Sequence, residues 1–321
     1  MAGRQSLSSK PPSTPSSASK QVLVDNDLRR ISFHQTIALG AFYDVRTESI
    51  VDRLSLNAKI ITESVQSKET QCEVLTADEI DHEDILRKVG IDQESWLNAV
   101  LDHGPSQGML ALINYSFPKS PNIRLLYYYY TSKDQAISSV KNSVMAYISK
   151  DTPTISATHI VSAVKLGIQV LVVLEVPVAS SIDLIRALES AAEQLSKNKF
   201  QTSSNQKSLL NQIIVRKVFS NIPALVDTSN LTQICQKLVD IKPHPFRHCS
   251  LEFTLRTIKW FYPLYPNEKA RYIALEPEIV KTISQYLLMF SAKTNELKSA
   301  FNAQNKKMLE EHVRKQYETF Q

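Results

Sequence analysis

Three groups of residues have side chains and spacings that could do chemistry, and the first is a metal-like set. His244, His248 and Cys249 combine zinc-binding residue types at short spacing. A structural zinc site needs four ligands, which usually come as two spaced pairs. Here Pro243 and Pro245 interrupt the set, and no second pair follows nearby. The pattern therefore predicts a surface loop and no metal.

The second group is acidic. Carboxylates cluster at Asp78, Glu79, Asp81, Glu83 and Asp84. Oxygen ligands suit Ca²⁺, but a calcium-binding loop also needs a glycine turn and ligands at fixed alternating positions, which this segment lacks. We therefore expect a solvated helical face.

The third group centres on His159, which follows Ser156, Ala157 and Thr158 at the start of a long apolar run. A single histidine there is more often structural, and sequence order alone predicts no catalytic triad. The chain has only six glycines, no two within three residues of each other, and so no glycine-rich phosphate loop. No nucleophile elbow or HExxH motif occurs either. We expect no enzyme and no cofactor.

Four consecutive tyrosines, residues 127–130, lie within the run IRLLYYYYT at 123–131. Aromatic residues favour a pleated surface, so the run predicts a strand with two tyrosines on each face. The strand could be a stacking platform for bases or sugars, or could be buried between helices on both faces, and we favour the second. The formal charge of +5 is spread along the chain, which disfavours a nucleic-acid partner.

The elements that would position these residues are strands and helices in mixed order. Residues 158–178 are the longest strand-like segment, and its single internal Gly167 indicates a bend or a close backbone approach. Further strands are predicted over 29–52, 123–131, 209–219 and 252–262. Helices are predicted over 134–149, from Ser180, over 227–240 with Asp227 or Ser229 as cap, and over 278–319, with one break considered near Asn302.

Composition divides the chain into parts. Residues 1–21 are rich in Ser, Pro and Lys and should be a disordered tail. We expect a main domain over 22–241, a linker and strand over 242–277 and a C-terminal helical segment over 278–321. Three scattered cysteines, with no apolar signal region or membrane-spanning run, favour a cytoplasmic protein. Release by another route, or membrane contact from the soluble state, stays open.

The segment ATHIVSAVKLGIQVLVVLEV carries a resemblance to a known family. Its Ala157, Thr158, His159 and Gly167 resemble the signature of the perforin, membrane-attack-complex and cholesterol-dependent-cytolysin superfamily. There a small residue, Thr or Ser, and His precede a strand with a glycine pair. This chain keeps one glycine, and is closer to the stonustoxin branch, whose strand also departs from the pair. We interpret these four residues as a structural hinge at the base of the long strand.

Two more segments support that branch in the same order along the chain. Residues 38–56 are similar to its opening strand, and residues 253–264 resemble the strand that leads into its helical domain. The matching positions of the opening strand are Leu39, Gly40, Tyr43, Asp44 and Arg46. The resemblance implies an α+β fold, a twisted antiparallel central sheet flanked by helical clusters, with a C-terminal helical extension.

In the resembled superfamily the two helical clusters unfurl into amphipathic β-hairpins of an oligomeric barrel. The corresponding segments here are about 84–120 and 178–208. The first fits in part: one strand face would carry apolar side chains, but Leu110 and Leu112 make the other face apolar too. The residues of the apolar face are Met109, Ala111, Ile113, Tyr115 and Phe117. In the second, Arg186, Glu189 and Glu193 fall on both strand faces, and each charge at the bilayer centre costs about 2–4 kcal/mol.

Two functions follow, neither catalytic. The first is a pore-forming-toxin-like protein that acts through oligomerisation and membrane contact. The alternative is a non-lytic intracellular interaction module that binds a partner through its C-terminal helices. The predicted partner-binding stripe consists of Ile279, Ile283, Leu287, Phe290, Leu297 and Phe301. Because this helical segment is shorter than in the resembled branch, we expect it to dock on the core, dimerise or bind a different protein.

Overall fold

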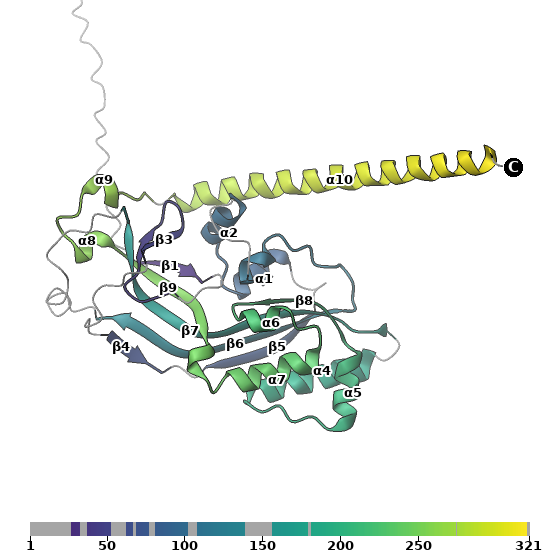
Figure 1. Ribbon diagram of the computed structural model, residues 1–321, viewed down its shortest axis with the longest axis horizontal. Helices are drawn as coiled ribbons and strands as arrows, with labels where there is room; N and C mark the ends of the chain where they lie inside the picture. Colours follow the sequence, from purple (N-terminus) through teal and green to yellow (C-terminus); the bar gives the residue numbers. More distant parts are fainter. Residues whose placement is uncertain are drawn as a thin grey trace, which may run out of the picture.

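The computed structural model describes residues 27–32, 37–52, 62–66, 69–76, 81–101, 108–138, 156–178, 181–273 and 275–319. Within these ranges the chain forms a nine-stranded antiparallel sheet with helices on both faces and one long C-terminal helix (Figure 1). The predicted α+β fold class is confirmed. The predicted tail, residues 1–21, lies outside the described residues.

Nine strands make the sheet, and β7 is its central member. In chain order they are β1 (Leu28–Ile31), β2 (Phe42–Asp44), β3 (Ser49–Asp52), β4 (Thr62–Val65), β5 (Thr70–Thr76), β6 (Ile123–Ile137), β7 (His159–Glu175), β8 (Ile214–Ser220) and β9 (Cys249–Thr257). The long β6 pairs along almost all of β7. On the same side of β7, β2 pairs with its first two residues, and on the other side β9 and then β8 pair with it.

Helices cover both faces of the sheet. They are α1 (His82–Lys88), α2 (Gln93–Val100), the 3-10 helix η1 (Gly108–Leu112), α4 (Ser181–Ser196), α5 (Ser204–Gln212), α6 (Pro223–Val226), α7 (Leu231–Ile241), the 3-10 helix η3 (Pro245–Arg247), α8 (Ile258–Phe261), α9 (Asn267–Ala270) and α10 (Pro277–Thr319). One core joins α4, α5 and α7 to the sheet. A second core, on the opposite face, joins α1, α2 and η1 to it.

Burial on both faces explains the residue pattern of the central strands. Residues 167–174 of β7 are all buried, so this strand shows no apolar–polar alternation. The tyrosines of β6 alternate as predicted, with Tyr128 and Tyr130 in the first core and Tyr127 and Tyr129 against the second. The interpretation of a strand buried between helices is therefore confirmed.

Gly167 lies where three strands crowd together. A Cβ at this position would be 1.9 Å from the Tyr130 backbone oxygen and 2.7 Å from Cδ1 of Leu251. The β6–β7 register shifts between Thr131 and Lys133, next to this glycine. Only a residue without a side chain fits such a close backbone approach.

Several predicted boundaries were wrong. The predicted helix over 134–149 begins as strand, because β6 continues to Ile137, and residues 139–149 lie outside the described part. The predicted strand over 209–219 starts as the end of α5, and β8 begins only at Ile214. Its adjacent apolar residues suit either element, so periodicity could not separate them.

The later elements also differ in detail from expectation. Asn230 caps α7, since its side chain accepts a hydrogen bond from the Gln233 amide, and neither Asp227 nor Ser229 does so. The strand predicted over 252–262 ends at Thr257, where α8 follows, and α10 passes Asn302 without a break. Within the segment 242–277, β9 lies between β1 and β7 in the sheet.

Candidate functional site

The structure brings the two family-like segments into direct contact. Tyr43 of β2 pairs with His159 at the start of β7. The Thr158 hydroxyl accepts a hydrogen bond from the Val45 amide (2.9 Å) and donates one to the Tyr43 carbonyl oxygen (3.3 Å). This side chain therefore reinforces the backbone pairing between the opening strand and the base of the long strand.

Neighbouring residues reinforce this junction. Arg46 binds Asp44 through two nitrogens, each 2.8 Å from a carboxylate oxygen, and also donates to the Ser156 hydroxyl. The Ala157 amide donates to the Tyr265 hydroxyl at 3.0 Å.

The predicted Leu39 and Gly40 form the turn before β2. Gly40 has a φ of 83°, which favours glycine, and its amide donates to the Val161 carbonyl at 2.8 Å. Leu39 packs against buried side chains on both sides of the turn. The predicted signature residues other than Gly167 thus belong to one junction.

His159 has the surroundings of a structural residue. It is 3% exposed, its Nδ1 lies 2.9 Å from the Thr158 hydroxyl, and its ring packs edge-on against Tyr272. Burial, with Arg30 nearby, lowers the pKa of His159 to about 4, so the ring is neutral at physiological pH. An uncharged, enclosed ring is poorly placed to serve as a base for an external substrate.

Beside this junction lies a buried ionic cluster that sequence reasoning missed. Arg30 of β1 is 3% exposed, and its guanidinium contacts Glu48 (3.1 Å) and Glu94 of α2 (2.7 Å). Glu48 also accepts hydrogen bonds from Tyr43 (2.8 Å) and from Asn98 (3.0 Å). We call these residues, with Tyr272, the ionic cluster.

The ionic cluster connects α2 and the segment before α10 to the sheet. The Tyr272 hydroxyl donates to Glu94 at 2.8 Å. Burial alone would lower the pKa of Arg30, but Glu48 and Glu94 outweigh it and raise that pKa. Burial raises the pKa of Glu48, against the opposing effect of Arg30. No local pattern in the sequence signals a cluster whose members come from four separate segments: β1, the β2–β3 hairpin, α2 and the segment before α10.

Among the described side chains, those of α10 that contact the body lie near its start. Val280 is buried in the second core, and Ile283 and Leu287 pack against it. Figure 1 shows the rest of the helix projecting beyond the sheet and the other helices. For the side chains that the structure describes, the predicted docking on the core involves the first turns of α10.

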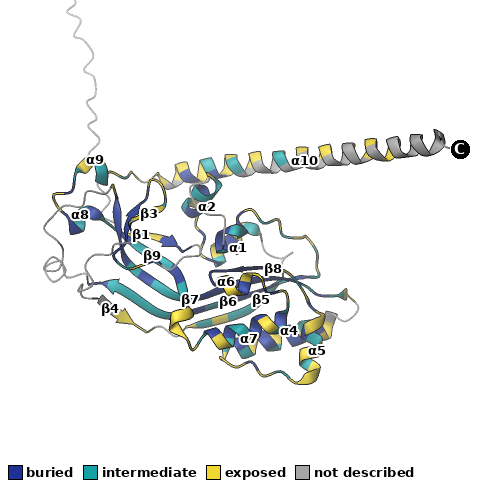
Figure 2. Cartoon of the chain, viewed as in Figure 1, coloured by how far each residue is buried: buried dark blue, intermediate teal, exposed yellow. Residues whose placement is uncertain are grey.

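Beyond Leu287 the same helix face continues exposed. Four large apolar side chains lie along it, with exposed fractions of 74% for Phe290, 71% for Leu297, 65% for Phe301 and 63% for Met308. We call these four residues the exposed stripe. Figure 2 shows exposed residues along this part of α10. From Leu287 the spacings of three, seven, four and seven residues are those of a coiled-coil seam.

The two segments expected to form hairpins are packed as helices and core in this structure. Met109 and Ile113 are buried in the second core, and Ala111, Tyr115 and Phe117 pack against it. The second segment forms α4 and α5.

As a helix, α4 separates its polar and apolar side chains. Its charged Arg186, Glu189 and Glu193 are exposed, while Leu184 and Leu188 are buried. An amphipathic helix suits this sequence better than an alternating strand.

The metal-like and acidic groups have ordinary surroundings. His248 Nε2 donates to the Lys242 carbonyl (3.1 Å), and its ring packs on Tyr130. His244 packs on Phe246. Among the residues that the structure describes, no three His, Cys, Asp or Glu side chains are grouped to hold a metal ion.

Of the acidic group, Asp78 and Glu79 lie outside the described residues. Asp81, Glu83 and Asp84 are exposed at the start of α1. Carboxylates in the first turn interact favourably with the helix dipole, which accounts for their position.

Over the described ranges, no helix combines the length and apolar character needed to cross a bilayer. No protein-family model matches the sequence, and no curated protein is significantly similar to it.

Similar solved structures include stonustoxin, pneumolysin and a putative cell invasion protein with a MAC/Perforin domain from Bacteroides thetaiotaomicron. Stonustoxin is 14% identical with a TM-score of 0.45, over 81% of this chain and 33% of its own. Pneumolysin is 17% identical with a TM-score of 0.31, over 61% and 40%. The invasion protein is 9% identical with a TM-score of 0.28, over 81% and 62%. The chain therefore spans about a third of the stonustoxin chain.

Proposed function

We propose that this chain is a non-catalytic protein that works by binding another protein along the exposed stripe of α10. One observation carries the proposal. The apolar face of α10 starts in the second core at Val280 and continues, in the same heptad register, into four side chains that are more than 60% exposed. Large apolar residues in register along one helix face are typical of a seam that packs against a second helix.

The free energy gained by burying the exposed stripe can be compared with the cost of association. Burying one Phe, Leu or Met side chain contributes about 1.5–3 kcal/mol, so four contribute about 6–12 kcal/mol. Association itself costs roughly 4–15 kcal/mol, which means that the stripe is a binding centre that needs flanking contacts. The partner must therefore cover surface beside the stripe as well.

The flanking charges indicate the partner's chemistry. With Phe301 and Met308 at core positions of the heptad, Lys293 and Lys307 take the flanking position on one side, and both are exposed. Lys293 also forms a surface ion pair with Glu296 (3.0 Å), which solvent screens. An amphipathic helix with acidic flanks complements this arrangement. If two copies paired antiparallel, the lysines of both copies would lie on the same side of the seam and repel each other. We therefore favour a different protein over a second copy as the partner.

A photocrosslinking experiment tests this function with the full chain. Leu297 is replaced by benzoyl-phenylalanine in one variant, and exposed Met289, which lies off the stripe, in a control variant. We expect a discrete crosslinked protein only with the label at position 297, and its loss when Phe301→Glu is added. Equal adducts at both positions, or none at either, would refute the proposal.

Light scattering measures the mass of the same chain in solution and so tests whether a second copy occupies the exposed stripe instead. We expect a monomer mass in the absence of partner, because like charges flank the stripe. A concentration-dependent dimer that Phe301→Glu abolishes would replace the heterologous partner with a second copy.

A second candidate function is membrane contact through the segment around η1. Met109, Ile113 and Phe117 would share one face if this segment became a strand, as lipid-facing residues of a barrel strand do. The same side chains now fill the second core, so insertion would first require them to leave it. A liposome dye-release assay tests this candidate, and an absence of both leakage and ring particles across lipid compositions would eliminate it.

A further inference from the structure

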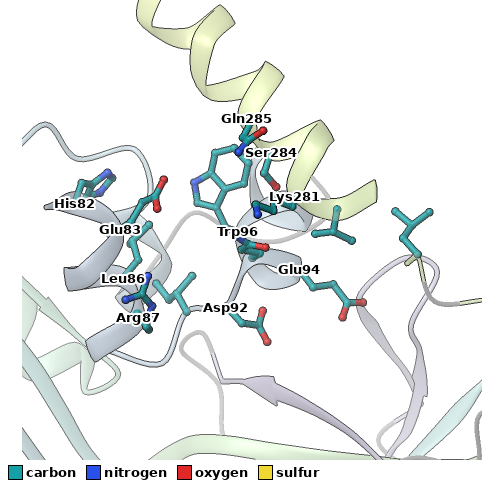
Figure 3. Close-up of a pocket in the computed structure, with 14 residues that line it drawn as sticks. His82, Glu83, Leu86, Arg87, Asp92, Glu94, Trp96, Lys281, Ser284 and Gln285 are labelled. Carbon is teal, nitrogen blue, oxygen red and sulfur yellow. The ribbon is translucent and has the colours of Figure 1, made fainter. Parts of the chain in front are cut away.

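A cavity of about 580 Å³ lies between α1, α2 and the first turns of α10 (Figure 3). Its volume falls within the range of about 300–1,000 Å³ that is usual for small-molecule sites. No residue of the exposed stripe lines this cavity, so the proposed function does not depend on the cavity.

Part of the cavity wall is apolar and rigidly placed. Leu86 and Ile91 line it from the side of α1, Trp96 from α2 and Val280 from α10. All four are at most 8% exposed, because they belong to the second core. The parts of these side chains that face the cavity would contact an apolar ligand body.

The α10 side of the cavity offers donors that the protein leaves unused. Ser284 is 5% exposed, lines the cavity, and its hydroxyl has no hydrogen-bond partner in the part of the chain that the structure describes. Buried hydroxyls are nearly always paired, so an unpaired one facing a cavity indicates a missing group. Figure 3 shows Lys281 and Gln285 on the same side, close to Trp96.

Lys281 gives this side a positive charge. It lies three residues before Ser284, so both occupy one face of the helix. Among the described residues its ammonium group makes no ion pair. An ammonium group and a hydroxyl that face one cavity together suit an anionic oxygen.

The carboxylates that line the cavity are mostly engaged elsewhere. Glu94 is bound by Arg30 and Tyr272, and Asp92 accepts from the Ser95 amide at the start of α2. Glu83 is the remaining acid, and it is exposed on α1, on the side of the cavity away from α10. Arg87 also lines the cavity from α1, but it pairs with Asp84 (2.9 Å). Among the described residues that line the cavity, Lys281 is the cation without an ion pair, so an anionic head group is favoured at the α10 side.

We propose that this cavity binds an amphipathic monoanion, such as a medium-chain carboxylate. The apolar chain lies against Leu86, Ile91 and Trp96. The head group accepts hydrogen bonds from the Lys281 ammonium group and from the Ser284 hydroxyl. Such a ligand contacts α1, α2 and α10 at once, and it therefore also stabilises the attachment of α10 to the body.

Trp96 provides a direct readout of binding. The chain has two tryptophans, so Trp260→Phe leaves Trp96 as the single reporter at the cavity. Three probes with the same alkyl chain are titrated below their micelle concentrations: dodecanoate, dodecanol and dodecyltrimethylammonium. We expect a saturable change in Trp96 emission with dodecanoate, and binding at least about tenfold weaker for the alcohol and the cation.

Variants locate the head group. Ser284→Ala and Lys281→Gln should each weaken dodecanoate binding about tenfold. The control Lys119→Gln, an exposed lysine that does not line the cavity, should leave it unchanged. Circular dichroism confirms that each variant is folded, and calorimetry on the natural chain replaces fluorescence if Trp260→Phe does not fold.

Three results would overturn the proposal. They are no saturable binding of dodecanoate, equal or tighter binding of the alcohol or the cation, and unchanged affinity in both Ser284→Ala and Lys281→Gln. Each of these leaves the binding function of the exposed stripe untouched, because no variant in this series alters a stripe residue.

Discussion

Replacing Arg30 by Met tests whether the ionic cluster holds α2 and the base of α10 to the sheet. The substitution leaves Glu48, whose side chain is 4% exposed, without its cationic partner. Breaking one partner of a buried ion pair usually costs about 3–5 kcal/mol. Tyr43 and Asn98 still donate to Glu48, so we expect a loss of about 3 kcal/mol, at the lower end of that range.

The loss should depend on pH in a defined direction. Burial already raises the pKa of Glu48 above its ordinary value of 4.5, and Arg30 opposes that rise. Without Arg30 the folded-state pKa rises further, so the folded protein binds a proton more readily than the unfolded chain. Stability then falls as pH rises through the window between the two values. The variant should therefore be closest to the natural chain at mildly acidic pH and furthest from it at neutral pH.

Arg29→Met is the matched control for this experiment. Arg29 is the preceding residue on β1, but its side chain is 79% exposed and lies 4.0 Å from Glu252. Such a surface pair contributes at most about 1 kcal/mol. Urea unfolding followed by tryptophan fluorescence measures both variants, together with the double variant Arg30→Met/Glu48→Gln, which should recover much of the loss. Equal losses for Arg29 and Arg30, or no recovery in the double variant, would refute the role of the cluster.

Three further predictions concern the strands and the cysteines. Gly167→Ala should lower the melting temperature far more than Gly90→Ala. A Cβ at Gly167 would lie 1.9 Å from a carbonyl oxygen, whereas a Cβ at Gly90 would have space and would cost stability mainly because the backbone there has a positive φ. Thr158→Val should cost about 1–3 kcal/mol in urea unfolding, since it removes a buried hydroxyl with two backbone partners. Burial raises the pKa of the Cys72 thiol to about 12 and also raises the pKa of the Cys235 thiol. Iodoacetamide at mildly alkaline pH should therefore modify both thiols far more slowly in the folded protein than in the unfolded chain. Mass spectrometry of the modified peptides measures the two rates.

The sequence was informative wherever local pattern and burial agree. The continuous apolar run of β7 and the aromatic run of β6 each predict a strand, since two covered faces require apolar residues throughout. The junction around Thr158 could be anticipated only through the resemblance, because its contacts join residues more than a hundred positions apart. The stripe on α10 could be predicted from heptad spacing alone.

The ionic cluster and the cavity could not be predicted in this way. Glu94 and Tyr272 are 178 residues apart, and Arg30 and Glu94 are 64 apart. Pairing at such separations depends on how whole elements pack, and a charged residue in a short strand reads as a surface residue until that packing is known. Ser284 was likewise unremarkable in sequence, since it becomes informative only through its burial and its unpaired hydroxyl.

The length of the projecting part of α10 strengthens the case for a partner. Residues 288–319 follow the last packed position and span about 48 Å as a helix. Most helical stability in proteins comes from packing an apolar face, and this part lacks such packing in the single chain wherever its side chains are described. A partner that covers the exposed stripe would therefore both gain apolar burial and stabilise the helix. Binding should accordingly raise the helical content and the hydrogen-exchange protection of residues 288–319, while the contacts of Val280 and Leu287 with the body stay as they are.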